Sequence, residues 1–238
     1  LPYLLAEPAM APADALFESV SGFTTTGSTV MSDIEAWPRG ILMWRSVTQW
    51  LGGLGILVLF VALLSYLGVG TKSLFRNESS FQTGEASTAR IRDTAISLWR
   101  VYLAITTACI LGLKAMGLSW YNAVSHGFTT VSTGGFSPHN KSIGYYSDWG
   151  NGWLIELWLS LFMLICSVSF LIWVVILRKR WKRLRSEEEG KWFFLICFCA
   201  ALMIAIGIAA KDMAGFWPAL RQAWFIVVSI GATTGFGT

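Results

Sequence analysis

The stretch "GFTTTGST" at residues 22–29 decides how the rest of the chain is interpreted. It places four threonines around Gly27 in a chain that is otherwise strongly apolar. Two similar stretches follow, "GFTTVSTGGFS" at 127–137 and "GATTGFGT" at 231–238. A motif that returns after roughly 100 residues indicates an internal repeat of a large structural unit.

The composition indicates a membrane protein. Of 238 residues, 54% are hydrophobic and 13% are charged, whereas a soluble domain carries about 25% charged residues. Long apolar stretches at 154–177 and 192–210 fit the length of about 20 residues that crosses a bilayer as a helix. Tryptophans stand near the ends of such stretches, as expected at membrane interfaces: Trp37, Trp44, Trp153, Trp192 and Trp217.

Each repeat is predicted to consist of a membrane span, a short helix, a Thr/Gly loop and a second span. The expected short helices cover 13–24, 119–130 and 217–231, and the expected spans 41–68, 94–114, 151–177 and 191–210. This divides the chain into the end of repeat 1 (1–69), a loop (70–93), repeat 2 (94–177), a basic loop (178–190) and the start of repeat 3 (191–238). Residues 1–12 are expected to be the tail of a helix. We therefore expect a fragment, with repeats 1 and 3 incomplete.

Basic residues predict which side each loop faces. The loop at 70–93 and the run "RKRWKRLR" at 178–185 both follow the second span of a repeat, so both are expected in the cytoplasm. The Thr/Gly loops then lie on the outer side. The basic run is explained by attraction to lipid headgroups, with docking of a cytoplasmic partner as the alternative. Nucleic-acid binding is not expected, because no folded soluble domain accompanies the charge.

The chemistry of a cation filter explains the Thr/Gly loops. Non-helical backbone at membrane depth occurs only where it is buried in protein or lines a water-filled cavity. Its carbonyl oxygens can replace the hydration shell of a cation. Glycine permits the positive φ values that turn successive carbonyls, and threonine adds a hydroxyl acceptor.

Four segments carry a family resemblance. They are "ALFESVSGFTTTGSTV" at 15–30, "WRSVTQWLGGLGI" at 44–56, "ARIRDTAISLWRVYL" at 89–103 and "HGFTTVSTGGFSPHNKSIGYY" at 126–146. In these segments the chain resembles the TrkH branch of the Trk/Ktr/HKT cation transporters. The resemblance implies an all-α integral membrane protein whose units of outer helix, pore helix with filter loop, and inner helix surround a central pore pseudo-fourfold. It also implies a homodimer and a cytoplasmic ring of nucleotide-binding regulatory subunits of the TrkA type.

The resemblance further implies which residues form the ion filter. The family's filter maps onto Thr25-Thr26-Gly27, Ser132-Thr133-Gly134 and Thr233-Thr234-Gly235, with Gly135 competing with Gly134 in the second loop. Sodium-favouring plant members have serine at the first filter glycine. Because glycine stands at Gly27, the resemblance favours K⁺ as the transported ion, bound at these residues without any other cofactor.

The predicted function is potassium uptake across the cell inner membrane, gated by the regulatory subunit. Low-selectivity sodium/potassium transport and a non-conducting membrane scaffold are the alternatives. An enzyme is not expected, since the motifs HExxH, GxSxG, GxxxxGK[ST] and CxxC are missing from the sequence; an intramembrane hydrolase is the enzymatic alternative.

Two groups of residues outside the filter invite competing interpretations. Arg45 is expected to support the filter loop or to pair with Glu18, and snorkelling to the membrane interface is the alternative. Gly52, Gly53 and Gly55 indicate either close packing against a pore helix or a hinge. The run "GATTG" at 231–235 also fits a GxxxG helix-packing motif, but its likeness to the other loops favours a filter.

Overall fold

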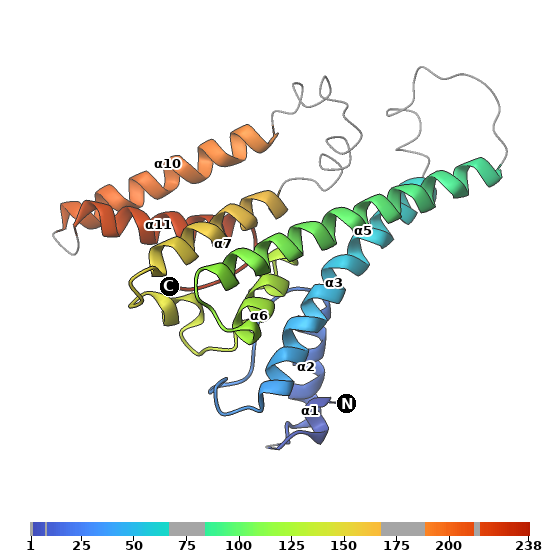
Figure 1. The fold of residues 1–238 in the computed structure, drawn as a ribbon, viewed down its shortest axis with the longest axis horizontal. Coiled ribbons are helices and arrows are strands. Elements are labelled where there is room, and N and C mark those ends of the chain that lie inside the picture. The colour runs from blue at the N-terminus through green and yellow to red at the C-terminus, as the bar shows by residue number, and fades with distance from the viewer. Residues whose placement is uncertain (1, 8, 67–83, 168–188, 212–214) are drawn as a thin grey trace.

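The computed structural model describes residues 2–7, 9–66, 84–167, 189–211 and 215–238. Within these ranges the fold is all-helical, as predicted (Figure 1). In chain order the elements are α1 (Pro2–Leu5), α2 (Pro12–Phe23), α3 (Arg39–Tyr66), α5 (Gly84–Ala115), α6 (Trp120–Val131), the 3₁₀ helix η1 (Ser142–Tyr146), α7 (Gly152–Ser167), α10 (Glu189–Ala210) and α11 (Phe216–Gly231).

The three predicted short helices are present as α2, α6 and α11, each within one residue of the expected bounds. Their beginnings follow ordinary helix chemistry. Pro12 occupies the first turn of α2, where its missing N–H costs nothing. The Ser119 side chain caps α6 by accepting a hydrogen bond from the Asn122 N–H, which satisfies one of the free donors of the first turn.

Two predicted boundaries are wrong. α5 begins at Gly84, so residues 84–93 are helical and do not belong to a loop at 70–93. Helix-forming residues such as Ala and Glu continue a helix beyond its apolar stretch, and hydropathy alone does not register this. The first helix ends at Leu5, so no helical tail extends to residue 12. The remainder of the predicted loop, and the basic run at 178–185, lie outside the described residues.

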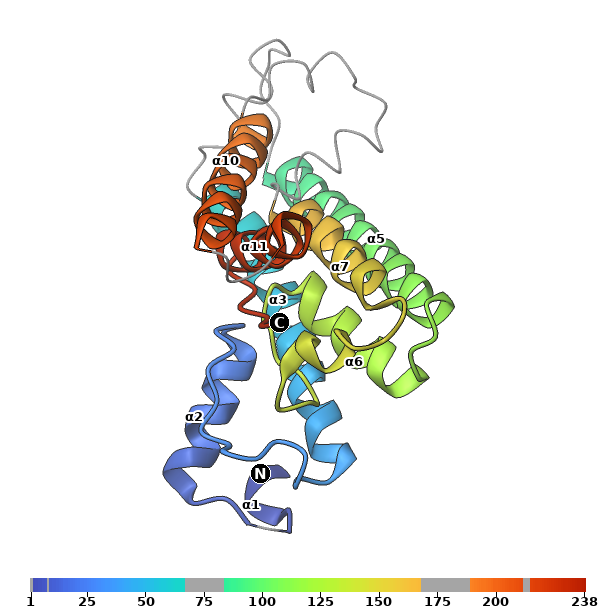
Figure 2. The same cartoon turned by 90° about the vertical axis from the view of Figure 1, so that its left-hand side faces the viewer.

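The helices are arranged in a repeating order (Figures 1 and 2). α6 packs against the preceding α5, and α11 against the preceding α10. The long helix that follows each Thr/Gly loop then contacts the short helix of the next repeat: α3 contacts α6, and α7 contacts α11. α2 packs against α3. Each repeat is therefore joined to the next through its second long helix.

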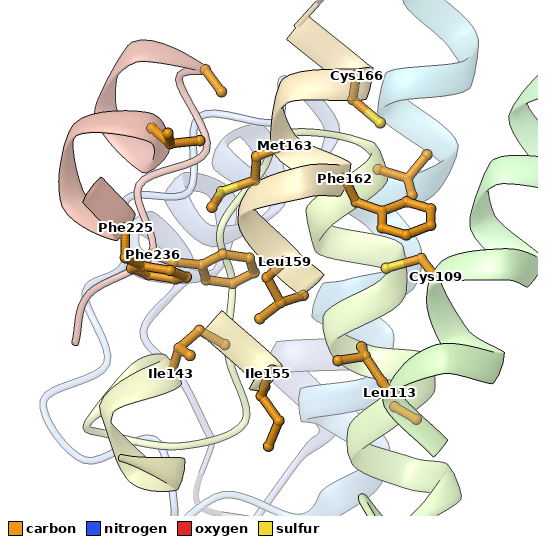
Figure 3. Packing of buried hydrophobic residues seen from close by; sticks show 14 of the residues in the cluster. Cys109, Leu113, Ile143, Ile155, Leu159, Phe162, Met163, Cys166, Phe225 and Phe236 are labelled. Atoms are coloured by element: carbon orange, nitrogen blue, oxygen red, sulfur yellow. The ribbon is translucent and has the colours of Figure 1, made fainter. Parts of the chain in front are cut away.

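The main hydrophobic core surrounds α7 (Figure 3). Leu159 on α7 is fully buried and lies toward Phe225 on α11 and Phe236 in the third Thr/Gly loop. Phe162, on the other side of α7, lies toward Cys109 on α5. The same helix thus packs against the second repeat's first long helix and the third repeat's loop.

Two described segments have the length and apolarity of membrane spans. They are Ala95–Ala115 in α5, with a mean hydropathy of 1.6, and Gly190–Ala210 in α10, with a mean hydropathy of 2.8. Large apolar side chains on α10, such as Ile196 and Met203, are exposed. An exposed apolar helix face of this kind suits a lipid environment. The described part of α7 is a shorter apolar helix.

The contact between α5 and α7 gives a test of this packing. A Cβ added at Gly112 on α5 would overlap the indole ring of Trp158 on α7, whose Nε1 donates to the Cys109 carbonyl at 3.2 Å. We expect Gly112→Ala to lower the free energy of unfolding by about 1–3 kcal/mol through overpacking, measured by thermal denaturation in detergent.

The matched control is Gly207→Ala on α10, where a Cβ meets no atom of the described residues within 4 Å. It should leave stability unchanged or raise it by up to about 1 kcal/mol, since alanine is the better helix former. Equal effects of the two substitutions would contradict the packing of α5 on α7.

Candidate functional site

The three short helices end in the same way. Each has a C-terminal cap residue close to helical geometry, followed by a threonine with positive φ. The caps are Thr24 (φ −84°), Ser132 (φ −79°) and Ala232 (φ −82°). The threonines are Thr25 (φ 57°), Thr133 (φ 52°) and Thr233 (φ 58°). Positive φ is unusual for a β-branched residue, so its appearance at three matching places marks one repeated backbone structure.

A glycine with positive φ stands two residues after each of these threonines. The three are Gly27 (φ 78°), Gly135 (φ 76°) and Gly235 (φ 80°). The structural equivalent of Thr25-Thr26-Gly27 and Thr233-Thr234-Gly235 is therefore Thr133-Gly134-Gly135. The predicted alignment Ser132-Thr133-Gly134 is displaced by one residue, because Ser132 still belongs to the end of α6.

Backbone hydrogen bonds support the new alignment. The middle residue of each loop donates its N–H to a carbonyl in the last turns of the preceding helix: Thr26 to Ser21 at 3.0 Å, Gly134 to Thr129 at 2.8 Å and Thr234 to Ser229 at 2.9 Å. These bonds satisfy carbonyls that a helix C-terminus leaves free. The three loops are thus attached to their helices in equivalent ways.

The loops lie against one another in chain order. A Cβ added at Gly27 would overlap the carbonyl oxygen of Gly134, and one added at Gly135 would overlap the carbonyl oxygen of Thr234. In both cases the glycine of one loop touches the middle residue of the next. A Cβ at Gly235 meets no described atom within 4 Å. Glycine is required at the first two positions by space as well as by φ.

The segments that leave the loops are also joined. The Gly237 carbonyl accepts hydrogen bonds from Ile143 N at 3.1 Å and Gly144 N at 3.2 Å, which places the end of the described chain beside η1 (Figure 2). Within loops 1 and 3, a serine on the short helix holds the exit of its own loop: Ser21 Oγ donates to Ser28 O at 2.6 Å and Ser229 Oγ to Phe236 O at 2.9 Å.

Arg45 and Glu18 form a buried ion pair, as the sequence suggested. Arg45 Nε lies 3.3 Å from Glu18 Oε2, and the side chains are 1% and 0% exposed. This burial excludes snorkelling of Arg45 to an interface. Glu18 also accepts hydrogen bonds from Thr29 Oγ1 and Val30 N. The Arg45 guanidinium lies 4.0 Å from the centre of the Phe136 ring, so the pair contacts the exits of loops 1 and 2.

Gln49 was not identified from the sequence. Its fully buried amide lies on α3 and contacts loop 2: Nε2 donates to Gly134 O at 2.7 Å, and Oε1 accepts from Phe136 N at 3.1 Å. The sequence did contain a sign of its role: Gln49 is an uncharged polar residue in an apolar helix, and polar groups at membrane depth generally have a hydrogen-bond partner.

The glycines of α3 pack closely against the loops. A Cβ at Gly52 would overlap the Phe23 carbonyl at the end of α2, and one at Gly53 would lie 2.9 Å from the Cβ of Ser132. The close-packing interpretation is confirmed for both residues. A Cβ at Gly55 meets no atom within 4 Å among the residues that the structure describes. At 231–235 the helix ends at Gly231, so these residues are a loop and not a helix-packing motif.

Polar contacts join repeats 1 and 2 beyond the loops. Asn140 Oδ1 accepts from Ile34 N at 2.7 Å, and its Nδ2 donates to Asp33 Oδ1 at 2.8 Å. His139 Nδ1 lies 3.2 Å from Glu35 Oε1. Burial lowers the pKa of His139, and Glu35 opposes that shift. Among the described residues no group of three or more His, Cys, Asp or Glu side chains could hold a metal ion.

The arrangement defines a class of protein. Short helices point their C-terminal ends, which carry partial negative charge, at adjoining Thr/Gly loops rich in backbone carbonyls. The apolar helices of membrane-spanning length, α5 and α10, pack against the short helices α6 and α11. This is an all-helical arrangement of repeated helix–loop units that suits a membrane protein.

Comparison with known proteins identifies the family. The model of the TrkH family, described as cation transport protein, matches residues 1–234. The chain therefore belongs to the TrkH family, as the resemblance predicted.

Individual relatives agree. The chain is 42% identical over 231 residues to the Trk system potassium uptake protein TrkH of Halomonas elongata, covering 96% of this chain and 47% of the relative. It is 37% identical to TrkG of Escherichia coli, covering 94% and 46%. The crystal structure of the potassium transporter TrkH from Vibrio parahaemolyticus matches with a TM-score of 0.82 at 33% identity, covering 97% and 46%. The chain thus spans about half the length of the relatives it matches.

The buried ion pair predicts a non-additive effect of substitutions. Glu18→Gln leaves the buried Arg45 without its counter-charge, and removing one partner of a buried pair costs about 3–5 kcal/mol. We expect the double variant Glu18→Gln/Arg45→Met to lose less thermal stability than the sum of the two single variants.

Glu35→Gln provides the comparison. Its carboxylate is 48% exposed, and exposed pairs contribute about 0–1 kcal/mol, so this variant should melt close to the wild type. Strict additivity of the Glu18 and Arg45 substitutions would show that the two residues act independently.

Proposed function

We propose that the chain forms part of a potassium uptake protein that passes K⁺ through a filter built from its Thr/Gly loops. One observation carries the proposal: three loops share one unusual backbone conformation, and successive loops lie with a glycine against the next loop's carbonyl. The names of the relatives, which are potassium uptake proteins, support K⁺ as the ion.

The proposed filter residues are Thr25-Thr26-Gly27, Thr133-Gly134-Gly135 and Thr233-Thr234-Gly235, with Ser132 ending the second pore helix. Carbonyl oxygens near the C-terminal ends of three helices suit a dehydrated cation electrostatically. Because the surrounding helices are apolar, the attraction is weakened little by solvent. Binding must still be weak enough for the ion to leave. Each loop contributes one copy of the same short backbone turn.

The arrangement of the repeats favours pseudo-fourfold symmetry around the pore. A carbonyl of the following loop lies against Gly27 and another lies against Gly135. Beside Gly235, by contrast, no described atom lies within 4 Å of an added Cβ. We propose that the carbonyl of a fourth loop occupies this position. Relatives about twice as long as this chain have enough sequence for further repeats.

We also propose that the protein is inserted in the cell inner membrane, assembles as a homodimer and is gated by a cytoplasmic ring of TrkA-type subunits. The sequence of the basic run at 178–185 supplies positive charges that an acidic partner could bind. The chain lacks a GxxxxGK[ST] motif, so a regulatory nucleotide is assigned to the partner. Relatives named as potassium uptake proteins and a solved structure named as a potassium transporter favour transport over enzymatic activity and over a non-conducting scaffold.

Substitution of the first filter glycine tests the proposal. Gly27→Ser places a Cβ on the Gly134 carbonyl and forces a positive φ on a serine, a strain of about 1–2 kcal/mol before the clash is counted. In cells lacking their own potassium uptake systems, the full-length gene product carrying these 238 residues should restore growth in low potassium and rubidium uptake. Gly27→Ser should reduce that uptake by about tenfold or more or shift it toward sodium.

Two glycines away from the loops serve as controls. Within the described part of the chain, the Cβ added by Gly40→Ala meets no atom within 4 Å, and Gly117→Ala (φ +100°) introduces positive-φ strain without a clash. Both should retain uptake. Equal rescue by the wild type and Gly27→Ser would mean that loop 1 does not select the ion, and lack of rescue by the wild type with its partner supplied would favour a scaffold.

Gly235→Ala tests the fourth loop. In the described structure a Cβ there meets only open space, so the variant should behave like the strain control Gly117→Ala if no fourth loop exists. With a fourth carbonyl in place, the loss of rubidium uptake should match that of Gly135→Ala, whose Cβ overlaps the Thr234 carbonyl.

A further inference from the structure

The Gln49 side chain holds two peptide groups of the neighbouring repeat at once. Its amide donates to the Gly134 carbonyl at 2.7 Å and accepts from the Phe136 N–H at 3.1 Å. These groups belong to the peptide units on either side of Gly135, which has a φ of 76°. A glycine restricts its own backbone little, so Gln49 supplies the restraint that the residue itself lacks.

The sequence of loop 2 is adapted to this contact. Loops 1 and 3 have threonine at the middle position, Thr26 and Thr234, whereas loop 2 has Gly134. Gly134 does not have a positive φ, so backbone conformation does not require glycine there. A Cβ at Gly134 would overlap the amide group of Gln49. The missing side chain is therefore the space that the Gln49 amide occupies.

The contact with Gln49 also fixes the direction in which the Gly134 carbonyl points. Its oxygen accepts a hydrogen bond from a fully buried amide and lies against Gly27. An oxygen committed in this way is directed toward α3 and the first loop. If the peptide between Gly134 and Gly135 turned over, the number and direction of carbonyls facing the ion would change, and selectivity depends on both.

We propose that Gln49 is a positioning residue that fixes the peptide groups around Gly135 and thereby sets how strongly the pore discriminates between monovalent cations. This inference rests on the proposed function. Gln49 lies on α3 in repeat 1 and contacts the loop of repeat 2. Ion discrimination by loop 2 therefore depends on a helix of the preceding repeat.

Gln49→Glu tests the inference through its pH dependence. A carboxylate can accept from the Phe136 N–H but cannot donate to the Gly134 carbonyl, whereas a protonated carboxyl can do both. In vesicles containing the full-length gene product, we expect the ratio of rubidium to sodium uptake to be about tenfold below wild type at a pH of about 8, the change that the loss of one hydrogen bond to a buried group produces. At a pH of about 5.5 the ratio should return toward wild type.

Two variants separate this effect from general damage. Gln49→Met cannot form either hydrogen bond, so its ratio should be low at every pH. Gln222→Glu makes the same substitution at an exposed glutamine on α11 and should follow the wild-type pH profile. A purely structural role of Gln49 predicts the same loss in the Met and Glu variants without recovery at low pH.

A second pair of variants covers the case in which Gln49→Glu does not reach the membrane. Gly134→Ala should lose uptake because its methyl overlaps Gln49, and Gln49→Ala/Gly134→Ala should regain uptake while keeping a low rubidium-to-sodium ratio. A wild-type ratio in that double variant, or in Gln49→Glu at both pH values, overturns the inference and leaves the proposed function standing. Absence of uptake by the wild type would instead overturn the proposed function.

Discussion

The glycine of one Thr/Gly loop packs directly against a carbonyl of the next loop, and this contact limits how the helices can be arranged. It brings Gly27 against Gly134 and Gly135 against Thr234 with no room for a side chain. Backbone can approach this closely only where Cβ is missing. The C-terminal ends of the short helices must therefore lie close enough for their loops to touch. Each long helix that follows a loop must also pack against the next short helix, as α3 does against α6 and α7 against α11.

Such close approach places many backbone polar groups in apolar surroundings, and nearby side chains satisfy them. Glu18 accepts from Thr29 and Val30 at the exit of loop 1, and its charge is balanced by Arg45. Gln49 binds both a carbonyl and an N–H of loop 2. Unpaired polar groups are costly in an apolar environment, so these few buried polar residues hold the non-helical backbone in place.

Much of the fold could be predicted from the sequence, and the errors have identifiable causes. The short helices were located because apolar runs ended in Thr/Gly clusters. The start of α5 was misplaced because its first ten residues are helical but polar. The predicted alignment of the second loop was displaced by one residue because "STGG" contains two glycines. Only Gly135 has a positive φ. Gly134 is a glycine for a different reason, because the Gln49 amide occupies the space of a side chain there.

Composition, periodicity and motif likeness are local properties of the chain, so the membrane class, the internal repeat and the family could be predicted from the sequence. Pairing with Glu18 was only one of the roles that the sequence left open for Arg45, and the folded structure selected it. The tertiary structure decided the register of loop 2, the order in which the loops touch, and the function of Gln49 as a support for a loop 85 residues further along the chain. These features depend on contacts between distant segments. No pattern within one segment encodes them, because a hydrogen bond or a steric overlap exists only once both partners are placed.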